Sequence, residues 1–380
     1  MNKASRLLII SNMAHFIRNG EIVGHGPTAR EISHLASLFA SVRHVGCLHS
    51  GNAPDLMLPY TSPRVTLVPV PPAGGESAAR KLGILKHLAK YVTTIHRELR
   101  DADVVHVRCP ANIALLAIIQ LALRREPRLR WIKYAGNWRP DGREAWSYTF
   151  QRWWLRKNFA RSRVTVNGRW PDQPGHIHSF YNPCLTDDER AEARTLGAGK
   201  TLSEPIRLIF VGQLNAPKGV GRALQVMAEL KRRGIPATLD LVGDGPDRRH
   251  FEHLAQELGV GAVVRFLGWQ PRTALGPLYG TTHLILFPST SEGWPKVLSE
   301  AMAYGVVPLA GAVSSIPQYL SDFSSGRALP PDDTHGFAAA IEWYNQNPEA
   351  WRAESANGVA AAPYFTYSAY LERVRELLEL

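Results

Sequence analysis

The second half of the chain alternates short apolar runs with segments of helical spacing, and this rhythm restricts the possible folds more than any other feature of the sequence. The pattern predicts strands at 206–211, 237–242, 263–267 and 283–287. It predicts helices at 221–233, 246–258 and 295–304. Short apolar strands that alternate with helices pair in parallel and are buried on both faces. The crossovers between such strands are right-handed. We therefore expect an α/β unit with a doubly wound parallel sheet.

The first half alternates in the same style, although less regularly. Its apolar runs predict strands near 6–10, 44–48, 65–68, 104–107 and 131–134. The expected organisation is two Rossmann-like domains that face each other across a cleft. Its parts are an N-terminal domain at 1–185, a polar linker at 186–203, a second domain at 204–362 and a C-terminal helix at 363–380 that crosses back to the first domain. Open α/β sheets bind ligands at the carboxyl ends of their strands.

The charge of the chain is divided unequally between its halves. The net charge of +11 consists of +15 over residues 1–185 and −4 over the remainder. A strongly basic domain attracts an anionic partner such as a membrane surface, a diphosphate substrate or a nucleic acid. Cys47, Cys109 and Cys184 are too few and too far apart for a disulfide framework. With no long apolar window or export signal, these features predict a cytoplasmic protein.

The segment 287–305 carries two acidic residues around the start of a predicted helix. Glu292 follows an apolar strand, and Glu300 lies eight positions further on, inside the helix. A helix N-terminus is a natural seat for a diphosphate because its first N–H groups are unpaired and partly positive. Carboxylates would repel phosphate, but they accept hydrogen bonds from the hydroxyls of a sugar. A ligand with sugar hydroxyls on either side of a phosphate group explains all three features.

A second segment, 210–219, ends a predicted strand in a loop that places Lys218 just before the next helix. A lysine beside a helix start acts as a point charge that binds phosphate. The sequence therefore predicts that Lys218 contacts the same diphosphate as the helix after Glu292. The competing interpretation is an exposed turn lysine and a solvated helix start with acidic residues in its first turn.

At these residues the chain resembles the retaining glycosyltransferases of the GT-B fold, family 4 type, also known as glycosyl transferases group 1. The resemblance covers about 205–345. Its motifs are the Glu292/Glu300 pair, Val211-Gly-Gln-Leu-Asn-Ala-Pro-Lys-Gly219, Val242-Gly-Asp-Gly-Pro246, Phe266-Leu-Gly268 and Gly305-Val-Val-Pro308. Each motif is weak by itself, whereas the set is specific.

The resemblance implies a retaining hexosyltransferase that takes a nucleotide diphosphate sugar as donor and needs no cofactor and no metal. Glu300 would hold the ribose, Glu292 would contact the donor sugar, and Lys218 would stabilise the leaving diphosphate. The donor phosphate itself would take the proton of the acceptor. The other donor-binding positions that we expect are Gly26, Gly212, Gln213, Leu267, Gly293, Lys296 and Val297.

Two positions depart from the pattern of the family. Gln213 stands where an arginine is usual, so that half of the expected cationic clamp is missing. Arg222 or an arginine of the first domain compensates for this loss, or the enzyme is slow or inactive. Asn137 stands where many relatives have a histidine near the donor sugar, and we assign it a catalytic hydrogen-bonding role.

Other readings of the sequence lead to different functions. The segment 24–29 fits the dinucleotide fingerprint G-x-G-x-x-A, but its glycines come too far after the strand, and no acidic residue closes a second strand. An epimerase would need an acid and base pattern that we do not find. A catalytically weak or silent GT-B protein that binds nucleotide sugar or membrane and regulates a partner is the main alternative. Binding of nucleic acid ranks last, because the basic half has no recognisable reader motif.

The segment 77–100 has apolar residues at helical spacing, with Arg80, Lys81, Lys86, Lys90 and Arg97 elsewhere around the helix. Such a helix is typical of an element that binds an anionic membrane surface, and equally of one that packs its apolar stripe on its own sheet. The segment 152–157 combines tryptophans with cations and has the same two interpretations. The leading hypothesis is therefore a cytoplasmic enzyme, peripheral on the inner face of the membrane, that glycosylates a lipid-linked glycan or glycolipid during polysaccharide assembly.

Overall fold

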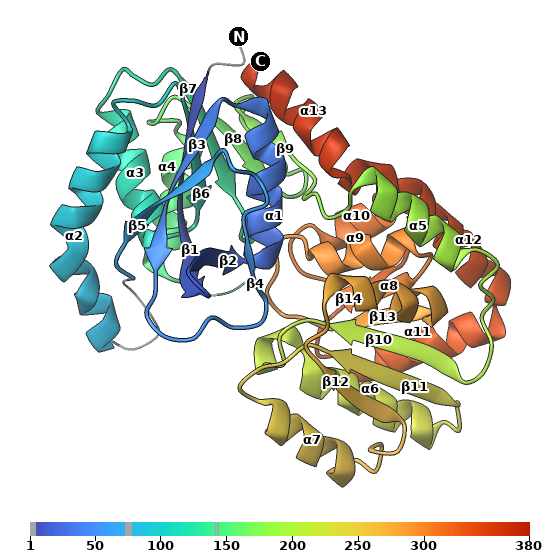
Figure 1. The fold of residues 1–380 in the computed structure, drawn as a ribbon. Helices are drawn as coiled ribbons and strands as arrows, with labels where there is room; N and C mark the ends of the chain where they lie inside the picture. The colour runs from blue at the N-terminus through green and yellow to red at the C-terminus, as the bar shows by residue number, and fades with distance from the viewer. Residues whose placement is uncertain (1–4, 73–77, 141, 143) are drawn as a thin grey trace. The chain divides into compact units, whose positions relative to one another are not determined.

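The computed structural model describes residues 5–72, 78–140, 142 and 144–380, which form two compact α/β units (Figure 1). Unit 1 consists of Met1–Phe180 and Tyr370–Leu380, and unit 2 consists of Tyr181–Ala369. The last helix, α13 (Tyr367–Leu378), therefore enters unit 1 from residue 370 onward. No helix in the described ranges is long and apolar enough to span a bilayer.

Unit 2 contains a parallel sheet with the strand order β12-β11-β10-β13-β14-β15. The bounds of its strands, in chain order, are β10 Ile206–Val211, β11 Ala237–Val242, β12 Val264–Gly268, β13 Leu284–Phe287, β14 Val307–Gly311 and β15 Arg327–Leu329. The four strands predicted for this half are confirmed to within one residue at each end. Their apolar side chains are buried because helices pack on the sheet.

The helices of unit 2 include the three predicted from helical spacing, which are confirmed to within two residues at each end. In chain order the helices are α5 Asp187–Gly197, α6 Val220–Arg232, α7 Arg248–Glu257, α8 Arg272–Thr281, α9 Lys296–Ala303, α10 Ile316–Phe323, α11 Thr334–Gln346 and α12 Pro348–Ala361. Helix α6 packs beside α7 and α11, whereas α5 packs beside α8 and α9.

The segment expected to be a polar linker, 186–203, is mostly helix α5. Thr186 accepts a hydrogen bond from the backbone N–H of Glu189, and the Glu189 side chain accepts one from the N–H of Thr186. This reciprocal capping box starts the helix at Asp187. The helix looks like a linker in the sequence because it buries only Ala193 fully and leaves its other side chains at least partly exposed.

Unit 1 contains a mixed sheet with the order β4-β2-β1-β6-β7-β8-β9, in which β3 also pairs with β1 and β5 pairs with β3. Its strands are β1 Arg6–Arg18, β2 Glu21–His25, β3 Ser41–Leu48, β4 Met57–Pro59, β5 Val65–Val70, β6 Val104–Cys109, β7 Leu129–Tyr134, β8 Arg163–Val166 and β9 Ile177–Ser179. The five strands predicted here are present, and β2, β4, β8 and β9 were not predicted.

The longest strand, β1, runs eight residues beyond the predicted segment 6–10 and turns back as an antiparallel hairpin with β2. The turn is Asn19-Gly20, and both residues have positive φ, as a tight hairpin turn requires. Gly24 consequently lies in a strand, and Gly26 is the first residue of helix α1 (Gly26–Leu35). The glycine-rich segment is therefore not the phosphate-binding loop of a dinucleotide fold.

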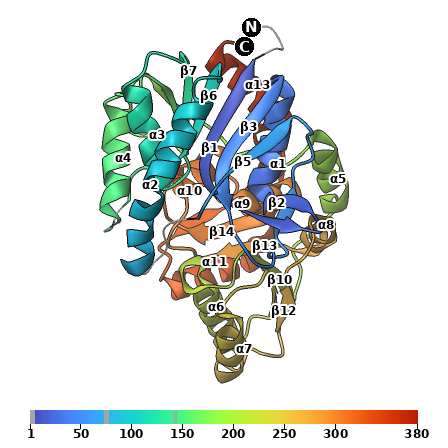
Figure 2. The ribbon, with the colours of Figure 1, turned by 60° about the vertical axis from the view of Figure 1, so that its left-hand side comes forward.

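Helices cover both faces of the unit 1 sheet (Figures 1 and 2). On one face lie α2 (Ala78–Glu98), α3 (Asn112–Ala122) and α4 (Trp146–Arg156), and α1 and α13 pack on the other. In the described part of the basic segment 77–100, Tyr91 and Ile95 of α2 and Leu99 just after it are buried against the sheet. Residue 77 lies outside the described residues.

Three histidines are buried on the α1 face of this sheet. Tyr60 Oη lies 2.7 Å from His15 Nε2 and 2.6 Å from His44 Nδ1, and the ring of His106 stacks on Trp131 at a centroid distance of 3.7 Å. Burial lowers the pKa of His15 from 6.5 to about 4 and also lowers the pKa values of His44 and His106. These rings are neutral in the native state and take up protons more readily when the chain unfolds.

The lowered pKa values predict that the protein loses stability as the pH falls below about 6.5. The unfolded chain then binds more protons than the native state, at about 1.4 kcal/mol per pH unit for each fully shifted histidine. Replacing His106 with Phe, which retains a ring against Trp131, should make the decrease between pH 6.5 and 5 shallower. Denaturant unfolding at pH 7, 6 and 5 measures this slope.

The matched control is His253→Phe, because the His253 side chain is 75 % exposed. This variant should follow the wild-type pH dependence. A His106→Phe protein with an unchanged slope would contradict the argument.

Candidate functional site

The loop after β10 holds Lys218 against the loop after β13. Gly219 has a φ of 89°, and a Cβ atom at this position would lie 2.2 Å from the carbonyl oxygen of Pro288. The backbone N–H of Thr290 donates to the Pro217 carbonyl at 3.0 Å. Asn215 Oδ1 accepts from the backbone N–H of Lys218 at 3.1 Å. Glycine is thus required for the close approach that brings the two loops together.

This approach brings Lys218 into contact with Glu292. Lys218 Nζ lies 2.5 Å from Glu292 Oε1, which also accepts a hydrogen bond from Ser289 Oγ at 2.9 Å. The Glu292 side chain is only 10 % exposed, whereas that of Lys218 is 31 % exposed. The ammonium group therefore neutralises a largely buried carboxylate and remains accessible to an anion.

Glu300 is held by a different cation, Arg272 at the start of α8. Arg272 Nη1 donates to Glu300 Oε1 at 2.6 Å, Nε donates to Glu189 Oε1 at 2.7 Å, and Nη2 donates to the Cys184 carbonyl at 2.7 Å. Burial opposes the charged form of Arg272, but Glu300 and Glu189 outweigh it and raise the pKa. Sequence reasoning missed Arg272, which belongs to no motif, and it missed Glu189 in the supposed linker.

The start of α9 lies between these two carboxylates along the chain. Pro295 is the N-cap residue, so that Lys296 and Val297 are the first residues of the helix, and Glu300 follows one turn later. Trp294 Nε1 donates to Ser299 Oγ at 2.7 Å, which ties the preceding loop to the helix. Gly293 lies in this loop, and its carbonyl accepts from Ser315. The helix thus begins at Lys296, within one residue of the predicted start.

The remaining candidates of unit 2 lie at the ends of β10 and β12. Gly212 follows β10 directly, and Leu267 lies within β12. Gln213 is exposed, and its side chain accepts a hydrogen bond from Asn215 at 3.0 Å. Arg222 donates to the Pro288 carbonyl at 2.8 Å and pairs with Asp332 at 3.3 Å. Arg222 therefore connects the two loops. Because its guanidinium group is engaged in these contacts, it is not available to replace the arginine that is missing at position 213.

Two candidates, Asn137 and Gly26, belong to unit 1. Asn137 follows β7, and its Oδ1 accepts from the backbone N–H of Arg139 at 3.0 Å. Gly26 is buried and donates its N–H to the Leu56 carbonyl at 3.1 Å. Their side-chain and backbone environments are local to this unit.

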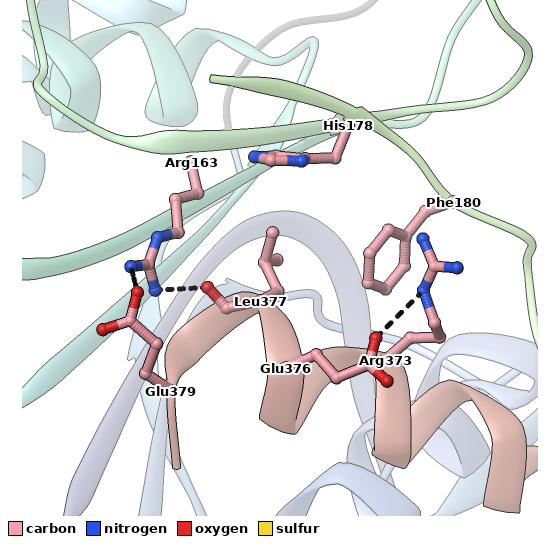
Figure 3. Close-up of a pocket in the computed structure, with 7 residues that line it drawn as sticks. All are labelled: Arg163, His178, Phe180, Arg373, Glu376, Leu377 and Glu379. Carbon is pink, nitrogen blue, oxygen red and sulfur yellow. Dashed lines mark hydrogen bonds and ion pairs between the residues drawn. The ribbon is translucent and has the colours of Figure 1, made fainter. Parts of the chain in front are cut away.

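Small pockets occur in both units. The unit 2 pocket of about 150 Å³ lies beside the Glu300–Arg272 pair and is also lined by Glu189, Tyr279 and Tyr304. The unit 1 pocket of about 260 Å³, shown in Figure 3, lies where α13 meets the sheet. Ion pairs of Arg163 with Glu379 and of Arg373 with Glu376 line it. None of the sequence-predicted residues lines the pocket in Figure 3.

Comparison with known families identifies the part of the chain that contains Lys218, Glu292 and Glu300. Residues 198–379 match the family model of Glycosyl transferases group 1. The α-D-kanosaminyltransferase of Streptomyces kanamyceticus is 29 % identical over 211 residues, which are 55 % of this chain and 54 % of that protein. The chain spans about half or less of the length of the curated relatives that it matches.

Solved structures extend the likeness in fold to both units. A sucrose-phosphate synthase from Thermosynechococcus elongatus matches with a TM-score of 0.71 at 19 % identity, covering 99 % of this chain and 98 % of that one. HepE of Anabaena, in complex with UDP and glucose, matches with a TM-score of 0.65 at 17 % identity over 99 % of both chains. The chain thus has the GT-B fold that the sequence predicted, with two Rossmann-like domains.

The contact at Gly219 predicts the effect of adding a single methyl group. Gly219→Ala should lower the free energy of unfolding by more than the 1–2 kcal/mol that is roughly expected for a left-handed backbone alone, because the new Cβ also collides with Pro288. Gly234→Ala is the matched control in the same unit, since Gly234 has a φ of 71° and nothing lies near its Cβ position. Equal losses in the two variants, measured by denaturant unfolding, would show that the loop contact is unimportant.

Proposed function

We propose that the protein is a glycosyltransferase that moves a sugar from a nucleotide diphosphate sugar to an acceptor. The observation that carries the proposal is the direct contact of Lys218 with Glu292 beside the N-terminus of a helix that contains Glu300. A cation, a helix N-terminus and two carboxylates suit a ligand that joins a diphosphate to hydroxyl-bearing sugars. The group 1 family match over the same residues supports this choice.

In the proposed mechanism each group of unit 2 has a separate task. Glu300, oriented by Arg272, accepts hydrogen bonds from the ribose hydroxyls, and Glu292 accepts them from the donor sugar. Lys218 turns from Glu292 toward the diphosphate and stabilises the charge that develops as the glycosidic bond to phosphate breaks. The backbone N–H groups of Lys296 and Val297 contact the same diphosphate.

The reaction that we propose retains the anomeric configuration and transfers a hexose. The donor phosphate takes the proton of the acceptor hydroxyl, so that no protein base and no metal is required. Asn137 and Gly26 of unit 1 keep the roles implied by the resemblance, namely hydrogen bonding to the donor sugar and a close approach of the backbone to the ligand. HepE was solved with UDP and glucose, which makes a uridine nucleotide the first donor to test.

The proposed acceptor is a lipid-linked glycan or glycolipid in polysaccharide assembly, and the proposed location is the inner face of the membrane. The excess of positive charge in residues 1–185 supports an anionic acceptor or surface. The exposed Lys86 and Lys90 of α2 lie on the basic segment assigned to that contact.

The proposal predicts specific binding and turnover. A nucleoside diphosphate at a hundred times its Kd should stabilise the protein by about 2.7 kcal/mol, which thermal-shift screening across the bases detects. Lys218→Met should lower kcat/KM about a hundredfold or more in a nucleotide-release assay with a panel of donors. Lys231→Met, in the same unit, is the control and should retain activity. Absence of nucleotide release with every donor and lipid-linked acceptor would contradict the proposal.

The alternative, a weak or silent protein that regulates a partner, is motivated by Gln213 and leads to a separate prediction. Arg222 is engaged by Pro288 and Asp332, so we expect Gln213→Arg to supply a missing cation and to raise kcat/KM about tenfold or more. Gln213→Met, which adds no charge, should leave activity unchanged. No gain in the arginine variant would indicate that another group already compensates for Gln213.

A further inference from the structure

Helix α4 presents a continuous stripe of aromatic rings to solvent. The exposed fractions of Trp146, Trp153 and Phe159 are 74 %, 46 % and 42 %. Ring centroids are 5.5 Å apart from Trp146 to Phe150, 5.6 Å from Phe150 to Trp153, and 5.4 Å from Trp153 to Phe159. Single exposed apolar residues are ordinary, but contiguous patches on a soluble protein mark interaction surfaces.

The fully buried residues of α4 are not those of the stripe, whose rings Phe150, Trp153 and Phe159 contact the core of unit 1 through the partly buried Trp154. Gln151 and Leu155 are the buried residues of the helix. Gln151 Oε1 accepts from the backbone N–H of Ala111 at 3.2 Å, at the start of α3. Trp146, Phe150 and Trp153 recur at helical spacing on a different side of the helix. Helix α4 therefore has two apolar sides, and only one of them is turned to the core.

Positive charge accompanies the stripe. Residues 145–163 contain five Lys and Arg and no Asp or Glu. Arg156 and Lys157 are exposed at the end of α4, and Arg152 is paired with Glu144. Tryptophan and tyrosine rings that alternate with basic residues are typical of the headgroup region of a membrane, where rings insert and cations meet phosphate.

The neighbouring helix α3 adds to the same surface. Arg130 Nη1 donates to the Leu121 carbonyl at the end of α3, at 2.7 Å, and to the Ala160 carbonyl just after α4, at 2.8 Å. The two helix ends are therefore joined, and Leu123, 83 % exposed, lies next to them in the chain. Helices α2, α3 and α4 cover the same face of the sheet (Figure 2), and Lys86 and Lys90 of α2 are exposed.

We propose that the α4 face, defined by Trp146, Phe150, Trp153, Phe159 and Leu123, docks on a membrane that contains anionic lipid. The rings insert at headgroup depth, and the cations of α4 and α2 bind lipid phosphates. A second copy of the chain would bring like charges together on this face, and a neutral glycan would leave the cations unused. The inference does not depend on the transferase activity, since lipid binding requires no donor.

The test is co-sedimentation of the full chain with vesicles of equal parts phosphatidylglycerol and phosphatidylcholine, and with phosphatidylcholine alone. The wild type should bind the anionic vesicles, release them in high salt, and bind the neutral vesicles at least tenfold more weakly. The triple variant Trp146→Ser, Trp153→Ser, Phe159→Ser should lose at least tenfold in partition to the anionic vesicles. The three side chains are exposed, so thermal unfolding should show a folded protein.

Two further variants make the experiment decisive. Trp269→Ser with Trp343→Ser removes aromatics of 39 % and 37 % exposure from unit 2 and should change vesicle binding less than twofold. Lys86→Glu with Lys90→Glu tests the basic helix α2 separately and should weaken binding only in part. The proposal is overturned if the wild type does not bind anionic vesicles, or if the α2 variant abolishes binding and the triple variant does not. It also fails if the triple variant instead dissociates a dimer or loses binding to a soluble glycan.

Discussion

The approach of the Gly219 turn to the Pro288 carbonyl is the constraint on which the candidate site depends. Lys218 and Glu292 are 74 positions apart, and they meet only because the loops after β10 and β13 touch at a residue without a side chain. These two strands are neighbours in a parallel sheet, so their carboxyl ends emerge at the same edge. The parallel sheet brings the two strand ends close together, and Gly219 allows the loops that follow them to come into contact.

Sequence reasoning located unit 2 well because its elements follow a simple rule. Strands 206–211 and 237–242 were predicted to the residue, since each is a short, mainly apolar segment that is followed directly by glycine. Lys218, Glu292 and Glu300 were proposed as site residues for a related reason, because each lies in the loop or helix that follows such a strand. The number of residues between each of them and its strand is a local property, which can be read from a single sequence.

What the sequence did not predict depends on long-range packing. Strand β2 forms because Asn19-Gly20 folds the extended β1 back on itself, and helix α5 forms because Thr186 and Glu189 cap each other within a segment of high polarity. Arg272 has no motif around it, and it joins Glu300 only after α8 and α9 are packed in the same unit. Buried histidines such as His106 are also invisible in the sequence, where they look like any other titratable residue.

The carboxylate of Glu189 serves two parts of unit 2. Its Oε2 accepts from the N–H of Thr186 and begins α5, and both of its oxygens accept from Arg272, which holds Glu300. Helix initiation and the orientation of a carboxylate 111 positions away therefore share one side chain. A substitution of Glu189 would therefore remove both interactions at once, although this residue lies outside the motifs that carry the resemblance to the family.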